Sequence, residues 1–296
     1  AIASYYYTLL MLDSQREVTR LTAESFHSSA ETMCAMMEAG MTNRAGVAQI
    51  EAAAYAAEAA LYDIDLKIRE VENSLCTLLG DVPSKIERSS FDMQTFTSDL
   101  AVGVPVALLS NRPDVRMAEY ALMQSYYATA AARSALYPTL TLSGLLGWTN
   151  NAGVVVSNPG SIILSATASL VAPIFNAGKA QAGVKIAEAQ QQEALIAFRQ
   201  SLINAGAEVN NSLAQVQIAR SKMEWREKQI ASLESAVEST EHLMQYGSTT
   251  YLDVLTAQQN LLAGRIDAIN DRYEEVQGII NLYIALGGGR EVDVID

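Results

Sequence analysis

The sequence predicts a mostly α-helical protein with one β-hairpin, in which long helices associate as coiled coils. Helical periodicity covers five segments, apolar residues in the longest of them recur every seven positions, and two short stretches alternate apolar and hydroxyl side chains. The five expected helices are Ser4 to Glu38, Arg44 to Leu79, Pro113 to Leu136, Lys179 to Tyr246 and Tyr251 to Leu286.

Composition excludes several classes of protein. The 296 residues carry a net charge of −13, and the pI is about 4.6. A chain this acidic has no basic surface with which to follow nucleic-acid phosphates, so no nucleic-acid partner is expected. Cys34 and Cys76 are interpreted as apolar filling residues, and His27 and His242 as isolated side chains, because none has the spacing of a metal or disulfide motif. No metal or cofactor is expected.

The start of the chain resembles the middle of an element. The opening stretch AIASYYYTLLMLDSQREV lacks a basic segment followed by an apolar one, and it has no cysteine for lipid attachment. No run of eighteen apolar residues occurs, so no transmembrane helix is expected. We interpret the chain as N-terminally incomplete.

The fourth helical segment carries the strongest coiled-coil signal. At about 1.5 Å per residue it would be roughly 100 Å long, which no globular core requires. A seven-residue apolar repeat makes helices supercoil about their neighbours. The repeating positions are Leu195, Leu202, Val209, Val216, Met223, Ile230, Val237 and Met244, followed in the next helix by Leu255, Leu262, Ile269, Val276 and Tyr283.

The chain also repeats itself at an offset of 207 residues. Gly40 then aligns with Gly247, Val47 with Val254, and Leu79 with Leu286. Each copy reads helix, glycine-centred turn, helix and Leu-Gly. The first copy lacks a counterpart of the residues before 208, which again indicates that upstream sequence is missing.

A different texture lies between the two copies. The stretches PTLTLSGLLGWTN and SIILSATASLVAPIF each place apolar residues on one face of a strand and hydroxyl residues on the other. An isolated hairpin is marginal in water, so its apolar face must be covered, either by a soluble core or by lipid outside a transmembrane barrel. The residues expected to face lipid in the second case are Leu140, Leu142, Leu146, Trp148, Ile162, Leu164 and Leu170.

Several motifs resemble the outer membrane efflux protein family, the TolC-like outer membrane factors of tripartite pumps. LLSNRPDVRMAEYAL is similar to the family's LL-x-x-RPD segment, ALYPTLTLSGLLG to its strand entry, and APIFNAGK to its strand exit. QYGSTTYLDVLTAQQNLL and LYIALGGG resemble two further family segments. The five occur in the family's order, which makes the resemblance specific.

The resemblance implies a homotrimer in the outer membrane of a Gram-negative bacterium. Its protomers share an α-barrel of long helices in the periplasm and a transmembrane β-barrel completed by trimerisation, with outer-membrane lipid outside. The chain departs from the family in lacking the first hairpin and the signal peptide, and lipidation stays open. The implied divisions are residues 1–80 (first periplasmic helical hairpin), 81–112 (linker), 113–136 (helix leading to the membrane), 137–176 (β-hairpin), 177–289 (second periplasmic helical hairpin) and 290–296 (tail).

The turns between paired helices are the candidate functional sites. In the family these turns form a periplasmic aperture that an adaptor protein opens. Asp253 and Thr256 are the expected aperture gate, although Asp253 could equally be a carboxylate that stabilises a helix start. The residues expected to bind the adaptor are Gly40, Met41, Thr42, Gly247, Ser248 and Thr249, which could also serve only to reverse the chain.

The resulting hypothesis is a passive exit duct for small molecules that works with a periplasmic adaptor and an inner-membrane transporter, of the RND type. No nucleophile and base pair, metal cluster or phosphate loop is recognisable, so no enzymatic activity is expected. Two alternatives remain at this point: a type I protein-secretion duct with the same architecture, and a soluble structural coiled-coil protein.

Overall fold

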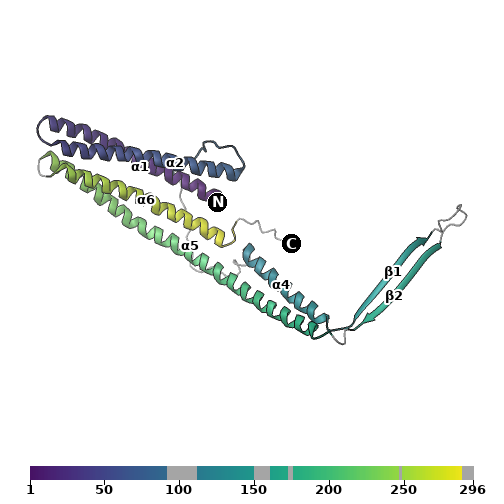
Figure 1. The fold of residues 1–296 in the computed structure, drawn as a ribbon. Helices are drawn as coiled ribbons and strands as arrows, with labels where there is room; N and C mark the ends of the chain where they lie inside the picture. Colours follow the sequence, from purple (N-terminus) through teal and green to yellow (C-terminus); the bar gives the residue numbers. More distant parts are fainter. Residues whose placement is uncertain (92–111, 150–160, 173–175, 247–248, 289–296) are drawn as a thin grey trace, which may run out of the picture. The chain divides into compact units, whose positions relative to one another are not determined.

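The computed structural model describes the chain except for residues 92–111, 150–160, 173–175, 247–248 and 289–296. The described residues form five helices and two strands in chain order (Figure 1). These are α1 (Ile2–Glu38), α2 (Arg44–Leu79), α4 (Pro113–Ser134), β1 (Thr139–Thr149), β2 (Ser161–Val171), α5 (Lys179–Gln245) and α6 (Tyr251–Ala285).

The predicted helices are confirmed, with small differences at their ends. α1 begins two residues earlier than expected, at Ile2, and α4 ends two residues earlier, at Ser134. Helix ends fray and depend on local capping, which periodicity does not report. Pro113 occupies the first turn of α4, where its missing N–H costs no hydrogen bond, and Asp114 accepts a hydrogen bond from the backbone N–H of Val115 at 2.9 Å.

The chain forms two compact units. The first comprises residues 1–105 and 207–296, and in it α1 packs along α2 and also contacts α6. Its main core lies between α1 and α2, where Phe26, Met33, Ile50 and Ala54 are buried and Leu255 of α6 joins them. Burial of these apolar side chains stabilises the paired helices.

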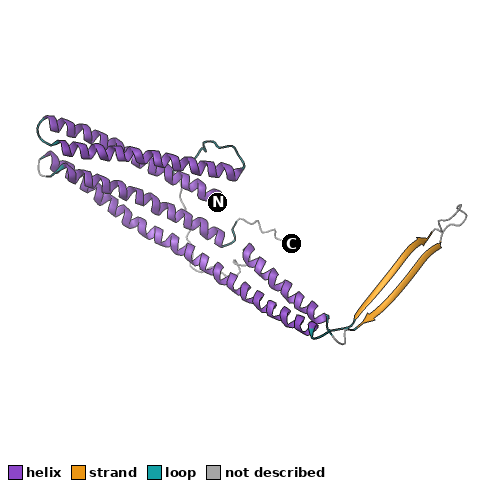
Figure 2. Ribbon diagram, in the orientation of Figure 1, coloured by secondary structure: helices purple, strands orange, loops and turns teal. Residues whose placement is uncertain are grey.

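The second unit comprises residues 106–206 and holds α4, the β-hairpin and the start of α5. α4 is joined to α5 by a hydrogen bond from the buried Thr129 hydroxyl to the carbonyl of Ala187, at 3.1 Å, and by an ion pair between Arg133 and Glu188. Figure 2 shows the strands as the one sheet among the described residues.

The two strands are antiparallel, and their register matches the predicted alternation. Leu140 pairs with Leu170, Leu146 with Leu164, and Trp148 with Ile162. The leucines of these pairs are all exposed, between 64% for Leu140 and 78% for Leu164. This strip of apolar side chains is therefore uncovered within the unit. The alternation is interrupted by Leu145, which pairs with Ser165 on the otherwise hydroxyl-rich face.

The seven-residue stripe of α5 also agrees with the structure. Val209 and Val216 are buried, and the other members of the stripe are all partly covered. In α6, Leu255 and Val276 are buried, but Tyr283 is 58% exposed. Across the described ranges, no helix combines the length and the hydrophobicity that a bilayer-spanning segment needs.

Candidate functional site: the two helix-turn-helix tips

The first tip is the turn between α1 and α2. Its helix ends in a Schellman motif: the N–H of Gly40 donates to the carbonyl of Met37 at 3.0 Å, and the N–H of Met41 donates to that of Met36 at 2.9 Å. Gly40 has φ of +73°, a conformation that side chains other than glycine rarely adopt. α2 then begins after Asn43, whose side-chain oxygen accepts from the N–H of Gly46 at 3.1 Å.

The second tip precedes α6 and is built around a carboxylate. Asp253 Oδ2 accepts hydrogen bonds from the hydroxyls of Thr249, at 2.6 Å, and Thr250, at 2.7 Å. It also accepts from the backbone N–H of Thr250 at 3.1 Å, which is the carboxylate half of a capping box. These bonds, led by that of Thr249, lower the pKa of Asp253, so an exposed negative charge is held at the helix start.

Thr256 lies one turn further along α6 and does not join this cluster. Its hydroxyl donates to the carbonyl of Leu252 at 2.7 Å, within its own helix. Thr256 therefore lies beside Asp253 on the helix without sharing its hydrogen bonds. Among the expected adaptor-binding residues, Gly40, Met41 and Thr42 lie in the first turn and Thr249 lies in the second, while Gly247 and Ser248 lie outside the described residues.

The two tips lie at the same end of the first unit (Figure 1). Leu255 and Tyr251, from the first turns of α6, pack on the core formed by α1 and α2. Burial raises the pKa of Tyr251. Tyr251 and Leu255 lie two residues before and after Asp253, so the helix start that carries the carboxylate packs against α1 and α2.

The 207-residue repeat is visible in the helix boundaries. α2 begins at Arg44 and α6 at Tyr251, which are 207 residues apart. Gly80 and Gly287 are separated by the same interval and have φ of +77° and +75°. The two copies thus share capping geometry at both ends of the second helix, although Gly46 stands where the second copy has Asp253.

A network of ion pairs joins α5 to α6 behind the second tip. Asp271 is buried and binds Lys222 at 3.2 Å and Arg226 at 2.9 Å, and Arg226 also reaches Asp267 at 3.1 Å. Burial acts to raise the pKa of Asp271, but hydrogen bonds from Arg226 and Lys222 outweigh it and leave the pKa lowered. The partners of Arg226 lie 41 and 45 residues away, so the charges beside it in the sequence, Glu224, Glu227 and Lys228, do not indicate this role.

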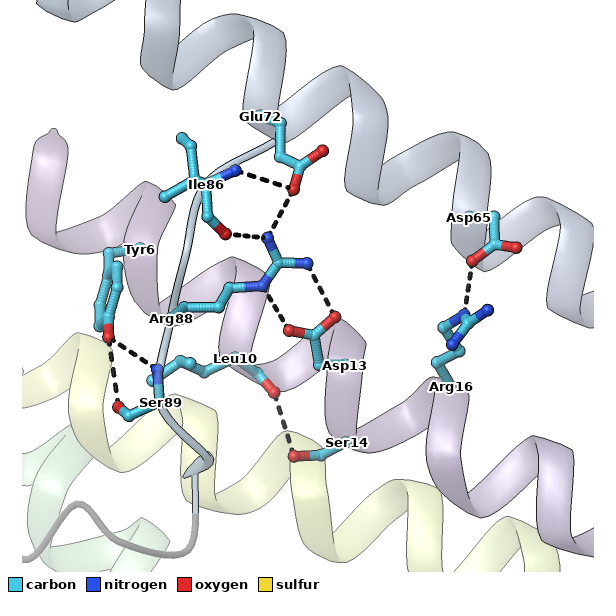
Figure 3. A network of polar contacts seen from close by, with 10 residues as sticks. All are labelled: Tyr6, Leu10, Asp13, Ser14, Arg16, Asp65, Glu72, Ile86, Arg88 and Ser89. Carbon is cyan, nitrogen blue, oxygen red and sulfur yellow. Dashed lines mark hydrogen bonds and ion pairs between the residues drawn. The ribbon is translucent and has the colours of Figure 1, made fainter. Parts of the chain in front are cut away.

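A second polar node ties the segment after α2 to both helices of the first hairpin (Figure 3). The Arg88 guanidinium is 9% exposed and bridges Asp13 of α1 and Glu72 of α2, with Glu72 at 2.5 Å. It also donates to the carbonyl of Ile86 at 3.0 Å. Nearby, the Tyr6 hydroxyl accepts from the N–H of Ser89 at 3.3 Å. Nothing in the sequence around Arg88 indicated this role, since all its carboxylate partners are distant along the chain.

No group of three or more histidine, cysteine and carboxylate side chains in the described ranges could hold a metal ion. Cys34 and Cys76 are both free thiols, and Cys76 is buried as expected for a filling residue. The His27 ring lies 2.7 Å from Glu58, a contact between the faces of α1 and α2.

Long paired helices with capped turns, followed by an exposed antiparallel hairpin, define the class of helical outer-membrane channels. Comparisons with known proteins agree. The model of the family described as outer membrane efflux protein matches residues 104–288, so the chain belongs to that family. The fold prediction and the expected outer-membrane location are thereby confirmed.

Individual relatives are similar along nearly the whole chain. The cation efflux system protein CusC of Escherichia coli is 28% identical over 292 residues, covering 97% of this chain and 63% of the relative. The pyoverdine export outer membrane protein OpmQ of Pseudomonas putida is 28% identical over 294 residues, covering 99% and 62%. The chain therefore spans about 63% of the length of such relatives.

Solved structures support the same fold. The outer membrane protein VceC of Vibrio cholerae superposes with a TM-score of 0.88 at 26% identity, over 97% of this chain and 69% of VceC. A crystal structure of CusC gives the same TM-score at 27% identity, covering 97% and 67%.

Proposed function

We propose that the intact protein containing this chain is a passive exit duct of a tripartite efflux system, carrying small molecules from the periplasm to the exterior. Membership of the efflux family supports this function. Relatives named for cation efflux, pyoverdine export and toluene efflux indicate that one architecture accepts different cargoes. The type I secretion alternative has no comparable support among these relatives, and membership of the family favours a duct over a soluble coiled-coil protein.

The proposed assembly is a homotrimer with a periplasmic adaptor and an inner-membrane transporter of the RND type. The exposed leucines of β1 and β2 would face outer-membrane lipid after the strands of three protomers close a barrel, because closure leaves no unpaired strand edge in the bilayer. The adaptor would bind the turns at Gly40 to Thr42 and Gly247 to Thr249. The duct itself would have no catalytic activity.

The observation that carries the gate proposal is the exposed carboxylate of Asp253, held at a helix start by Thr249 and Thr250. In a trimer it would occur three times about one axis, and such a ring attracts cations and narrows a pore. Asp253 is thus proposed as a single-acid gate, with Thr256 beside it contributing no charge.

Single-channel recording of the intact trimer in planar bilayers tests the gate. Asp253→Asn keeps a side-chain acceptor for the Thr250 N–H but removes the charge, and Asp253→Ala removes both. Both variants should increase conductance and weaken block of the closed channel by divalent cations. Thr250→Val removes one hydroxyl donor and leaves the charge, so it should retain cation block.

The four channels separate the two roles of Asp253. If Asp253→Asn behaves like the parent while Thr250→Val and Asp253→Ala open the channel, the residue acts only as a helix cap and the gate proposal is wrong. If the correctly assembled parent trimer showed no conductance at all, the duct function itself would be contradicted.

A further inference from the structure

The segment that follows α2 contacts both helical hairpins of the first unit. Residues 84–91, which we call the strap, first bind the hairpin of α1 and α2, where Arg88 bridges Asp13 and Glu72. The last residue of the strap, Phe91, is 2% exposed and lies among side chains of α1 and of α6, which belongs to the other hairpin. An aromatic side chain from neither hairpin is thus buried between the two.

Phe91 is part of a small core of its own. Leu10 of α1 and Val276 of α6 pack with it, and each is 1% exposed. The guanidinium of Arg272, also in α6, lies over the Phe91 ring, 5.1 Å from its centroid. The face of an aromatic ring attracts a cation placed in this way. Phe91 is therefore held to α6 by apolar packing and by a cation–π contact.

A groove interrupts the packing between the hairpins beside this core. It has a volume of about 450 Å³, and it lies between α1 on one side and α5 and α6 on the other. Phe91 borders the groove together with Val18, Ile230 and Ile269. Nearer the tips, Leu255 of α6 joins the core of α1 and α2. The Phe91 core therefore supplies a separate contact between the hairpins, at a distance from the tips.

The rigidity of α6 extends the effect of this contact along the helix. α6 is continuous from Tyr251 to Ala285, and Val276 lies 25 residues from its start, roughly 38 Å at 1.5 Å per residue. Close-packed interiors transmit displacements because they have few voids to absorb them. Fixing α6 at Arg272 and Val276 therefore also restricts movement of its first turns.

We propose that the strap is a latch, with Phe91 as its apolar end, that holds α6 against the first hairpin and so limits movement of the second tip. Movement of α6 relative to α1 then requires Phe91 to leave its core and the Arg272 guanidinium to leave the ring. The latch itself depends only on the contacts of the strap. Its consequence for a gate at Asp253 rests on the proposed function.

Amide hydrogen exchange of the intact protein, read on peptides from both hairpins, tests the latch. Phe91→Ala removes the apolar end of the strap. The first control is Ile68→Ala, which truncates an 8% exposed side chain in a core of α1 and α2 that holds no described residue of α6. The second control is Val82→Ala, which truncates an 81% exposed side chain shortly before the strap.

Phe91→Ala should accelerate exchange roughly 100-fold in peptides around Val276, because truncation of a buried phenylalanine is among the most costly core substitutions. It should also accelerate exchange at the start of α6, residues 251–262, by at least about fivefold, the lower end of typical coupling between distant sites. Ile68→Ala should accelerate exchange in α1 and α2 and leave residues 251–262 at the parent rate. Val82→Ala should change neither.

Phe91→Leu retains an apolar side chain without the aromatic ring, so it should give smaller accelerations at both places. This variant keeps the test decisive if Phe91→Ala does not assemble. An effect of the Phe91 variants confined to peptides around Val276 would overturn the proposal, and so would equal acceleration of residues 251–262 by Phe91→Ala and Ile68→Ala. Exchange is read without ion conduction, so these outcomes are separate from the test of the duct.

Discussion

Arg88 offers the sharpest test of how the first helical hairpin is held together. Its guanidinium is 9% exposed and contacts Asp13, which is 39% exposed, and Glu72, which is 11% exposed. The hydrogen bonds to Asp13 and then to Glu72 raise the pKa of Arg88, so the group remains charged at all relevant pH. Arg88→Met would leave the buried Glu72 carboxylate facing an uncharged side chain.

The magnitude follows from burial. Removing one partner of a buried ion pair costs about 3–5 kcal/mol, because the remaining charge is uncompensated. Asp13 can recover water, so we expect a loss near the lower limit, about 3 kcal/mol. The matched control is Arg16→Met, which breaks the exposed pair between Arg16 and Asp65, where both side chains are more than 40% exposed. Such surface pairs contribute about 0–1 kcal/mol. Figure 3 shows both arginines reaching across the same hairpin.

Native-state hydrogen exchange of the intact protein, read by mass spectrometry on peptides from α1 and α2, measures the effect. Arg88→Met should accelerate exchange roughly 100-fold, since each 1.4 kcal/mol corresponds to tenfold. Adding Glu72→Gln removes the stranded charge and should recover a large part of the protection. Equal exchange in Arg88→Met and Arg16→Met, or no recovery on adding Glu72→Gln, would refute the argument from an uncompensated buried carboxylate.

Two further predictions concern the contact between α5 and α6. A Cβ added at Gly278 would lie 2.7 Å from Val216 Cγ2 and 3.2 Å from the Val216 backbone nitrogen, so Gly278→Ala should destabilise this pair of helices by about 1–3 kcal/mol in thermal unfolding. The control Gly206→Ala has open space around the added Cβ and should stabilise the protein by up to about 1 kcal/mol. Equal effects of the two substitutions would contradict the close packing at Gly278. Because the pKa of Asp271 is lower in the folded state, its ion pairs stabilise the fold above the unfolded pKa of about 3.9, and this stability is lost as pH falls through the lower folded value. Asp271→Asn should therefore flatten the acid unfolding curve followed by circular dichroism. An unchanged acid midpoint would show that other carboxylates govern acid unfolding.

Much of the fold was predictable because its signals are periodic. The seven-residue stripe identified the face of α5 that Val216 occupies, and strand alternation put Leu146 and Leu164 on the same apolar face, where the structure pairs them. The 207-residue repeat predicted equivalent helix boundaries, because a glycine often follows the end of a helix. The structure shows Gly80 and Gly287 in the left-handed conformation at the two equivalent ends.

The site was only partly predictable. A helix-start carboxylate at Asp253 follows from its position three residues after Thr250, but the hydrogen bond of the Thr256 hydroxyl to its own helix is evident only in the structure. Arg88 and Arg226 depend on carboxylates brought close by tertiary packing, which no local pattern shows. Met41 was expected only as a docking residue. Its backbone hydrogen bond to Met36 could not be predicted, because the sequence does not show that the turn is a Schellman motif.

The two copies of the repeat keep the same caps on their second helix but differ in how their helices are joined. The first copy has an apolar core, with Phe26, Met33 and Ile50 almost fully buried between α1 and α2, and its charged bridge through Arg88 comes from the segment after α2. The second brings its helices close at Gly278 and adds charged bridges through Asp271. Apolar packing tolerates salt and pH, whereas ion pairs orient helices more strictly but respond to both. The two copies therefore retain the caps of their second helix while the contacts between their paired helices differ.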